Sequence, residues 1–328
     1  MQTGLTHNHQ PTGPMSGGCA SGIVSRVARR LFCGSGGRAV WVATFVTVFV
    51  AGACGGGEPT QPVGRVVDVP GVFVEVSAGF RHSCGLRDDA TIACWGDNSQ
   101  GQLDAPPGRY SAVSVGNYFS CAVREDASIA CWGSNFRGES DPPEGRYSAV
   151  AGGVAHACAL RPDGYVDCWG EDSFGSIEPP PWRFAAIDLG AAHSCGVRAD
   201  GIIKCWGVQG RTSVETPPVG RFDTLGAGGS AACGFRADGT AMCTGYFVNV
   251  LRPGRFTDVS IGWDHACGVR LDGSLRCWGD NSYGQGDPPG GRFEAVAAGG
   301  EHSCGLRGDG TVTCWGAVGS AQRHGLAR

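Results

Sequence analysis

The stretch His302–Gly316, HSCGLRGDGTVTCWG, contains the pattern on which the fold depends. Two cysteines, Cys304 and Cys314, lie ten residues apart, and a Trp-Gly pair follows the second one. Versions of this phrase occur seven times, and successive second cysteines are spaced by 37, 37, 37, 38, 34 and 37 residues. A fixed period in this range is typical of solenoids, propellers and similar arrays.

Each repeat predicts three short strands, of which the second and third form a hairpin. In CGVRADGIIKC, residues 195–205, Ala-Asp-Gly fits a three-residue loop with glycine in the left-handed position, which places Cys195 opposite Cys205. The first two repeats have Ala90 and Ala127 where the other five have glycine, and a positive φ there costs roughly 1–2 kcal/mol. We therefore expect these two turns to differ from the rest.

The paired cysteines share the apolar face of each hairpin, because strand side chains alternate between faces. We expect one disulfide per repeat, in the pairs Cys84–Cys94, Cys121–Cys131, Cys158–Cys168, Cys195–Cys205, Cys233–Cys243, Cys267–Cys277 and Cys304–Cys314. The alternative is a zinc site of one histidine and two cysteines. Two repeats have Phe119 and Ala231 in place of that histidine and keep both cysteines, so we expect disulfides, no metal and no cofactor.

The tryptophans of Trp-Gly lie on the opposite face of each hairpin, across from serine or alanine. Such small neighbours leave room for an indole to pack against the next sheet, and burying it contributes a few kcal/mol. We expect an inter-sheet wedge in six repeats, formed by Trp95, Trp132, Trp169, Trp206, Trp278 and Trp315. The fifth repeat has Thr244 instead, and the sequence does not separate a degraded unit from one reshaped for a partner.

The N-terminal residues have the composition of an export signal. Residues 1–53 contain four arginines and no acid, and an apolar run of about 14 residues ends in Ala51-Gly52-Ala53 before Cys54. This run is shorter than the ~20 residues that span a bilayer, so a secretory signal is favoured over a transmembrane helix. The small residues before Cys54 resemble a bacterial lipoprotein signal, which implies cleavage and acylation at Cys54 and an exported, envelope-anchored or extracellular protein.

We expect a signal peptide over residues 1–53, a Gly/Pro-rich tether over 54–70, the repeats over 71–316 and a tail over 317–328. Translation starting at Met15 is an alternative, since the segment ahead of the apolar run is long. Of 17 cysteines, 14 remain after Cys19, Cys33 and Cys54, two per repeat, as expected for an exported disulfide-bonded protein. Past residue 53 the chain carries a formal charge of −8, which argues against binding nucleic acid.

The stretches CWGDNSQGQL, residues 94–103, and CWGDNSYGQG, residues 277–286, carry a family pattern. With the His-x-Cys-Gly-Leu-Arg and Asp-Gly elements they resemble the regulator-of-chromosome-condensation repeat over residues 71–316. The short repeats are similar to the bacterial beta-lactamase-inhibitory branch, which implies an all-β, seven-bladed β-propeller of three-stranded blades of about 37 residues. An open solenoid is the alternative to a closed ring, and residues 66–69 would supply a closing strand.

The expected function is an exported, monomeric protein-binding scaffold without catalytic activity, held at a membrane only by its lipid. The alternatives are an inhibitor of a secreted or envelope hydrolase, a glycan-binding module and a propeller enzyme. Most polar residues recur once per repeat, as the arginine of Cys-Gly-Leu-Arg does, which favours structural roles such as pairing with the aspartate of the next turn. Guanine-nucleotide exchange in the family depends on an inserted wedge, for which these spacings leave no room.

The turn before His-x-Cys varies among repeats and is the predicted binding surface. Its candidate residues are Phe80, Arg81, Tyr118, Phe119, Trp263, Asp264 and Glu301. In the inhibitory branch an aromatic-rich loop face of this kind meets the target protein. The alternatives are scattered surface residues without a role, and the loops after Trp-Gly, with Phe136, Phe174 and Tyr283, which we expect on the opposite face.

Overall fold

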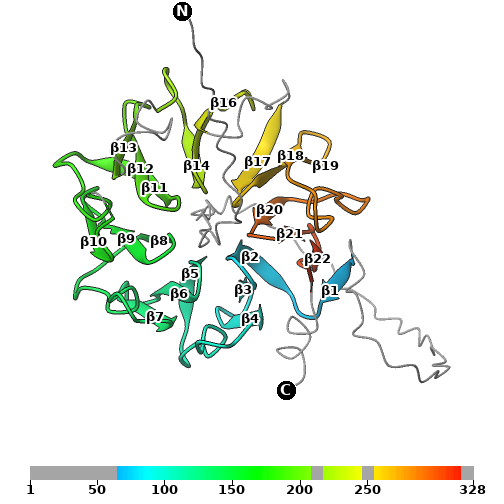
Figure 1. The fold of residues 1–328 in the computed structure, drawn as a ribbon, viewed down its shortest axis with the longest axis horizontal. Helices are drawn as coiled ribbons and strands as arrows, with labels where there is room; N and C mark the ends of the chain where they lie inside the picture. The colour runs from blue at the N-terminus through cyan, green and yellow to red at the C-terminus, as the bar shows by residue number, and fades with distance from the viewer. Residues whose placement is uncertain (1–64, 174, 208–216, 246–254, 319–328) are drawn as a thin grey trace, which may run out of the picture.

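The computed structural model describes residues 65–318 apart from 174, 208–216 and 246–254, so the predicted signal peptide, Cys54 and residues 319–328 of the predicted tail lie outside the described residues. Every regular element in this part of the chain is a β-strand, and the strands form seven sheets arranged in a ring (Figure 1). The described residues contain no helix long and apolar enough to span a bilayer. The predicted all-β, seven-bladed propeller is confirmed.

Each sheet is one blade with an inner, a middle and an outer strand. The blades are, in order, β2 (Phe73–Ala78), β3 (His82–Arg87) and β4 (Ile92–Gly96); β5 (Tyr110–Val115), β6 (Phe119–Arg124) and β7 (Ile129–Gly133); β8 (Ala149–Gly152), β9 (His156–Leu160) and β10 (Val166–Gly170); β11 (Phe184–Leu189), β12 (His193–Arg198) and β13 (Ile203–Gly207); β14 (Thr224–Gly228), β15 (Ala231–Phe235) and β16 (Ala241–Gly245); β17 (Phe256–Ile261), β18 (His265–Arg270) and β19 (Leu275–Gly279); and β20 (Ala295–Ala298), β21 (His302–Leu306) and β22 (Val312–Gly316).

Blade 7 has a fourth, outermost strand, β1 (Val67–Val69), supplied by the other end of the chain. It pairs antiparallel with β22, and the Asp68 carboxylate accepts a hydrogen bond of 2.6 Å from the Thr313 hydroxyl. The amide of Phe73 donates to Gly310 O at 2.8 Å, repeating the bond from Phe293 N to Gly273 O between blades 6 and 7. Blade 1 therefore packs on blade 7 as on any neighbour, and the expected closing strand is present within the last residues of the predicted tether.

All seven hairpins have the predicted register, with the two cysteines opposite each other and joined as disulfides. The expectation that the alanine-containing turns differ is wrong. Ala90 and Ala127 adopt φ values of 67° and 70°, close to the 81° of Gly201, and keep the same turn hydrogen bond to the preceding arginine carbonyl. The hairpin register imposes the left-handed conformation even where no glycine is present.

The hydrophobic core is divided among the seven boundaries between blades. At each of six boundaries, the indole of one blade lies in a cluster with the cystine of the preceding blade, as Trp132 does with Cys84 and Cys94. The cluster around Cys195 has no indole, because the next blade carries Thr244. The predicted wedge is confirmed, and its partner is the neighbouring disulfide.

The inner strands leave one backbone edge facing the centre of the ring, and side chains of the preceding blade bind to it. Ser77 Oγ accepts the amide of Val115 at 3.1 Å, and Asp188 Oδ2 accepts that of Ala227 at 2.7 Å. Ser114 and Ser260 bind the next blade in the same way. These bonds satisfy amides that an inner edge strand would otherwise leave unpaired.

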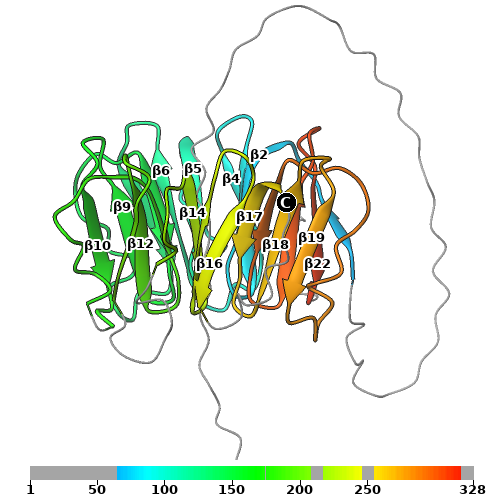
Figure 2. The ribbon, with the colours of Figure 1, turned by 90° about the horizontal axis from the view of Figure 1, so that it is seen from above.

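The connections gather on the two sides of the ring (Figure 2). The turns between inner and middle strands form the side that we call the glycine face, at residues 79–81, 116–118, 153–155, 190–192, 229–230, 262–264 and 299–301. The turns between middle and outer strands form the hairpin face, at residues 88–91, 125–128, 161–165, 199–202, 236–240, 271–274 and 307–311.

Candidate functional site

Glycines let the blades approach most closely at the glycine face. A Cβ on Gly79 would lie 2.2 Å from the carbonyl oxygen of Gly116, and one on Gly299 would lie 2.4 Å from that of Gly79. Backbone hydrogen bonds cross the same boundaries, as from Gly300 N to Gly79 O at 3.1 Å. Only glycine fits at such distances, so the sequence builds a narrow ring of backbone from which the turn side chains project.

Three aromatic side chains from three different blades meet on this face. The ring of Phe80 lies 6.3 Å from that of Tyr118 and 5.9 Å from that of Trp263, both edge-on. Phe80 reaches blade 6 because it crosses the turn of blade 7 at Gly300, where a Cβ would lie 2.2 Å from the phenyl ring. Phe80 is 6% exposed, whereas Tyr118 and Trp263 are half-buried and present part of their rings to solvent.

Charged side chains surround the aromatic cluster. The Arg81 guanidinium lies 5.2 Å from the Phe80 ring centre and 3.7 Å from Glu301 Oε1. Asp264 follows Trp263, and its burial together with the nearby Asp280 carboxylate raises its pKa. A carboxyl group that lacks a cationic partner and faces a second carboxylate makes this part of the face acidic.

Phe119 differs from the other predicted binding residues because it is 0% exposed. It begins β6 at the position of the histidine in other blades, and its ring fills the space beneath Gly116, where a Cβ would lie 2.3 Å from Cε1. Its side chain supports the turn from below. The solvent-facing part of the predicted surface is therefore Arg81, Tyr118, Trp263, Asp264 and Glu301.

The loops after Trp-Gly begin on the glycine face, so the expectation that they lie on the opposite face is wrong. Their first amides donate to carbonyls of the inner turns, as from Asp97 to Arg81 O at 2.9 Å and from Asp280 to Asp264 O at 2.8 Å. Phe136, 81% exposed, and Tyr283 stand in these loops, while Phe174 lies outside the described residues. The two predicted surfaces are parts of one acidic, aromatic face.

The histidines are buried at the start of the middle strands. His82 Nε2 lies 2.9 Å from Ser120 Oγ of the next blade, and the same contact joins His156 to Ser194, His265 to Ser303 and His302 to Ser83. Burial lowers the pKa of His82, His156 and His265 to about 3 and that of His193 and His302 to about 4. They are neutral hydrogen-bonding groups between blades.

Sequence reasoning missed this contact, although its signal was present. Each His-bearing blade is followed by a blade with serine before its first cysteine, and Phe119 and Ala231 are followed by Ala157 and Ala266. The exception is His193, whose Nε2 has no partner because the next blade has Ala232. Among the described residues no cluster of His, Cys, Asp or Glu has the arrangement of a metal site.

The repeated arginines of Cys-Gly-Leu-Arg have a different partner from the predicted one. Arg307 lies 4.3 Å from the ring centre of Phe293, and Arg236 lies 5.1 Å from that of Phe222 in the same blade. Only Arg198 makes the predicted ion pair, at 3.2 Å from Asp200 in the adjacent turn, among the ion pairs of the described residues. In blades 1, 2, 5 and 7 the arginine covers the first aromatic ring of its own blade by cation–π contact, whereas Arg161 pairs with Asp167 of its own hairpin.

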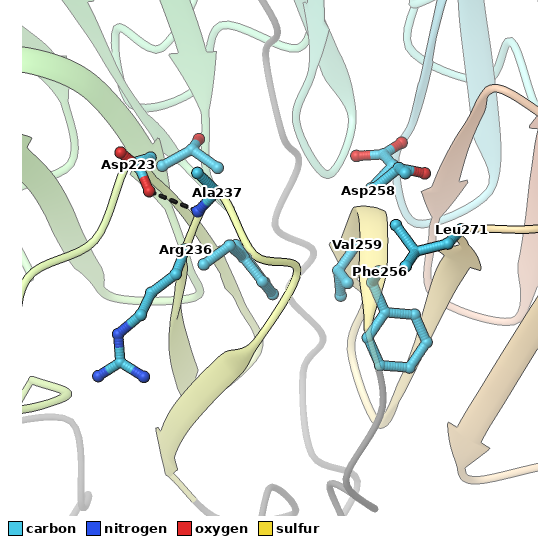
Figure 3. A pocket seen from close by; sticks show the side chains of 10 residues that line it. Asp223, Arg236, Ala237, Phe256, Asp258, Val259 and Leu271 are labelled. Atoms are coloured by element: carbon cyan, nitrogen blue, oxygen red, sulfur yellow. Dashed lines mark hydrogen bonds between the residues drawn. The ribbon is translucent and has the colours of Figure 1, made fainter.

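One cavity, of about 300 Å³, opens on the hairpin face between blades 5 and 6 (Figure 3). Asp223, Thr224 and Ala237 line it from blade 5, and Val259 and Leu271 line it from blade 6. No feature of the sequence indicates this site, because its walls come from strand ends of two blades that meet only when the blades stack.

A family model supports the repeat assignment. The model described as "Regulator of chromosome condensation (RCC1) repeat" matches residues 73–102, 110–139, 147–176, 256–285 and 293–319. These segments are blades 1, 2, 3, 6 and 7. No curated protein sequence matches the chain.

Solved structures share the fold. The CRINKLY WD40 ectodomain of the Arabidopsis thaliana receptor kinase ACR4 is 25% identical, covers 75% of this chain and 96% of its own, and superimposes with a TM-score of 0.63. The ectodomain of the Physcomitrella patens receptor kinase CR4 is 26% identical over 75% and 74%, with a TM-score of 0.65. Prp20p from Saccharomyces cerevisiae is 15% identical over 74% and 82%, with a TM-score of 0.58, which shows the fold alone.

Proposed function

Because this chain carries repeats of the regulator of chromosome condensation (RCC1) family, we propose that it is an exported protein-binding scaffold without catalytic activity. It binds another protein through its glycine face and is tethered to the bacterial envelope through Cys54. The observation that carries this proposal is the cluster of Phe80, Tyr118 and Trp263, which three different blades bring together on one rigid face.

Export is supported by the cysteine chemistry. Seven disulfides fit an oxidising, extracellular or exported setting, since cytosolic thiols are kept reduced. The two receptor-kinase structures reported above are also ectodomains. The arginine-rich, apolar segment before Cys54 supports secretion and anchoring.

The partner chemistry follows from the charge and shape of the glycine face. Half-buried tyrosine and tryptophan are the side chains that commonly dominate binding energy, and a backbone held by the glycine ring keeps them in place before binding. Asp264 and Asp280 add negative charge on this side beyond the carboxylates that pair with Arg81 and Arg137, which favours a partner surface with basic and apolar groups. The acidic character disfavours nucleic acid as the ligand.

Affinity capture from envelope extract tests the proposal, with residues 64–328 as bait. The Tyr118→Ala/Trp263→Ala double variant removes the exposed rings of the glycine face. The matched control is Tyr165→Ala/Trp182→Ala, which removes two exposed aromatic rings from the other side of the ring. A protein retained by the wild type and the control but lost by the first variant supports the proposal; retention that all three share, or none at all, would remove the glycine face as the binding surface.

A further inference from the structure

The cavity between blades 5 and 6 is independent of the glycine face. It lies on the other side of the ring, where the ends of β14 and β17 meet the turns after β15 and β18. Its volume of about 300 Å³ is at the lower end of the range for small-molecule sites.

The boundary between blades 5 and 6 lacks a contact that two other boundaries have. At the same position in blades 1 and 6, acidic side chains reach across to the next blade: Glu75 Oε2 lies 3.4 Å from Val113 N, and Asp258 Oδ2 lies 2.9 Å from Val296 N. Blade 5 has Thr224 at this position, and the other four blades have alanine there. The boundary between blades 5 and 6 thus lacks the carboxylate bridge that spans those two boundaries.

One part of the cavity wall is apolar. Phe235, Phe256 and Val259 are buried side chains that line it, and Leu271 stands at its mouth with 59% of its surface exposed. The exposed side chain of Leu271 would be shielded from water by a ligand bound in the cavity. An apolar group that enters the cavity would cover Leu271 and gain the free energy of burying its surface.

The charged groups at the cavity give it a negative character. The carboxylate of Asp223 lies at one side of the cavity, whereas the guanidinium of Arg236 points away (Figure 3). Asp258, at the other side, is 4% exposed, and its carboxylate accepts the Val296 amide of blade 7. That guanidinium lies 5.1 Å from the ring centre of Phe222 and donates from Nε to Arg221 O at 3.3 Å. Asp223 is exposed, and one of its oxygens accepts the amide of Ala237 at 2.6 Å, which fixes the carboxylate at the rim.

We propose that this cavity binds a small organic cation, in which a primary ammonium group is carried on an apolar ring or short chain. The apolar body would lie against Phe235, Phe256 and Leu271, and the ammonium would face Asp223. Charge complementarity selects the cation, because the cavity presents the Asp223 carboxylate at its rim and directs the Arg236 guanidinium elsewhere. The site does not depend on the proposed protein-binding function.

Titration of the disulfide-bonded chain with benzylammonium tests this assignment, with benzyl alcohol and benzoate as ligands of similar shape and different charge. Calorimetry and ligand-observed NMR report binding at millimolar concentration. We expect saturable binding of benzylammonium, affinity for the alcohol lower by about fivefold, and the weakest binding for benzoate. Equal affinity for the ammonium and the alcohol, or no saturable binding of the ammonium, would overturn the proposal.

Two matched variants locate the charge recognition. Asp223→Asn keeps an oxygen for the Ala237 amide and removes the charge, so we expect affinity for benzylammonium to fall by about threefold to fivefold. Glu294→Gln makes the same change at the equivalent position of blade 7, where the amide of Glu294 donates to Leu306 O as that of Asp223 does to Phe235 O. It should leave affinity unchanged. Thermal unfolding checks that both variants fold, and an Asp223→Asn protein that binds as the wild type does would contradict the site.

Discussion

Two alanines, Ala90 and Ala127, occupy a backbone conformation that glycine occupies in five other blades. A left-handed residue with a Cβ costs roughly 1–2 kcal/mol, because the Cβ approaches the following carbonyl oxygen. Both turns nevertheless keep the hydrogen bond from the alanine amide to the carbonyl of Arg87 or Arg124. The strand pairing and the disulfide behind each turn therefore outweigh the local strain.

Ala90→Gly should raise the free energy of unfolding by about 0.5–1 kcal/mol, since the relieved strain exceeds the entropy that glycine loses on folding. Urea unfolding of the two proteins measures the difference. The control is Gly201→Ala, which introduces the same strain into blade 4 and should lower stability by a similar amount. A less stable Ala90→Gly protein would show that these turns carry no strain.

Residue roles within one hairpin could be predicted, whereas roles between blades could not. The disulfides and the left-handed turn positions follow from alternation along two adjacent strands. The contact of His82 with Ser120 joins residues 38 apart in different blades, and it appears only once the blades are stacked. The burial of Phe119 could not be predicted for the same reason. The sequence places Phe119 in a turn, whereas in the structure it is the first residue of β6 and its ring lies beneath Gly116.

At the scale of elements, β1 is the strand on which closure depends. It is three residues long, yet it covers the outer edge of β22 and adds Val69 to the cluster at the boundary of blades 7 and 1. Its range could be predicted because four residues with alternating valines precede the first repeat. The prediction placed the loops after Trp-Gly on the wrong face of the ring. The outer strand is antiparallel to the middle strand, so it ends beside the start of the middle strand, on the glycine face.

A chain that begins at Pro70 should lose about 2–3 kcal/mol of unfolding free energy. The change removes the buried Val69 and the hydrogen bond of Asp68 to Thr313, and it exposes the edge of β22. Urea unfolding measures the loss. A chain that begins at Arg65 serves as the control and should match the mature protein; equal stability of all three would mean that β1 contributes nothing to the ring.

At the scale of the whole molecule, stability is distributed over seven boundaries, and five buried histidines make those boundaries sensitive to acid. Each histidine has a folded pKa of about 3 or 4, below its ordinary value of 6.5, so the unfolded chain binds more protons between these values. Their contribution is complete above pH 6.5 and is lost as pH falls toward 3. Burial acts oppositely on Glu75, whose pKa rises to about 8, and on Asp188, whose pKa also rises.

The histidines outnumber these two carboxyls, so the melting temperature should fall steeply between pH 6.5 and pH 4. It should also fall from pH 6.5 to pH 8, because the unfolded chain has already ionised these carboxyls while folded Glu75 stays protonated until about pH 8. Calorimetry across this range measures both slopes. His193→Gln should reduce the dependence of stability on pH in this acidic range by about one proton. The substitution removes no histidine–serine contact, since His193 has none. A melting temperature that is constant from pH 6.5 to pH 4 would contradict burial of neutral histidines.

The place where the chain enters the ring constrains how an anchored propeller would sit. β1 begins opposite Cys314 and runs antiparallel to β22, away from the glycine face, so the chain enters this blade from the glycine-face side. The twelve residues between Cys54 and Val67 would reach at most about 45 Å if fully extended, which would keep the glycine face close to the membrane that holds the lipid.

Cys54→Ser should therefore move the protein from the membrane fraction of the envelope to the soluble fraction, because acylation needs the thiol. Fractionation followed by immunodetection measures the distribution. Cys33→Ser is the control, since it removes a cysteine from within the predicted signal peptide, and it should leave the protein with the membrane. If both variants fractionate as the wild type does, the propeller is not held by Cys54, and its glycine face would be free to meet partners in any orientation.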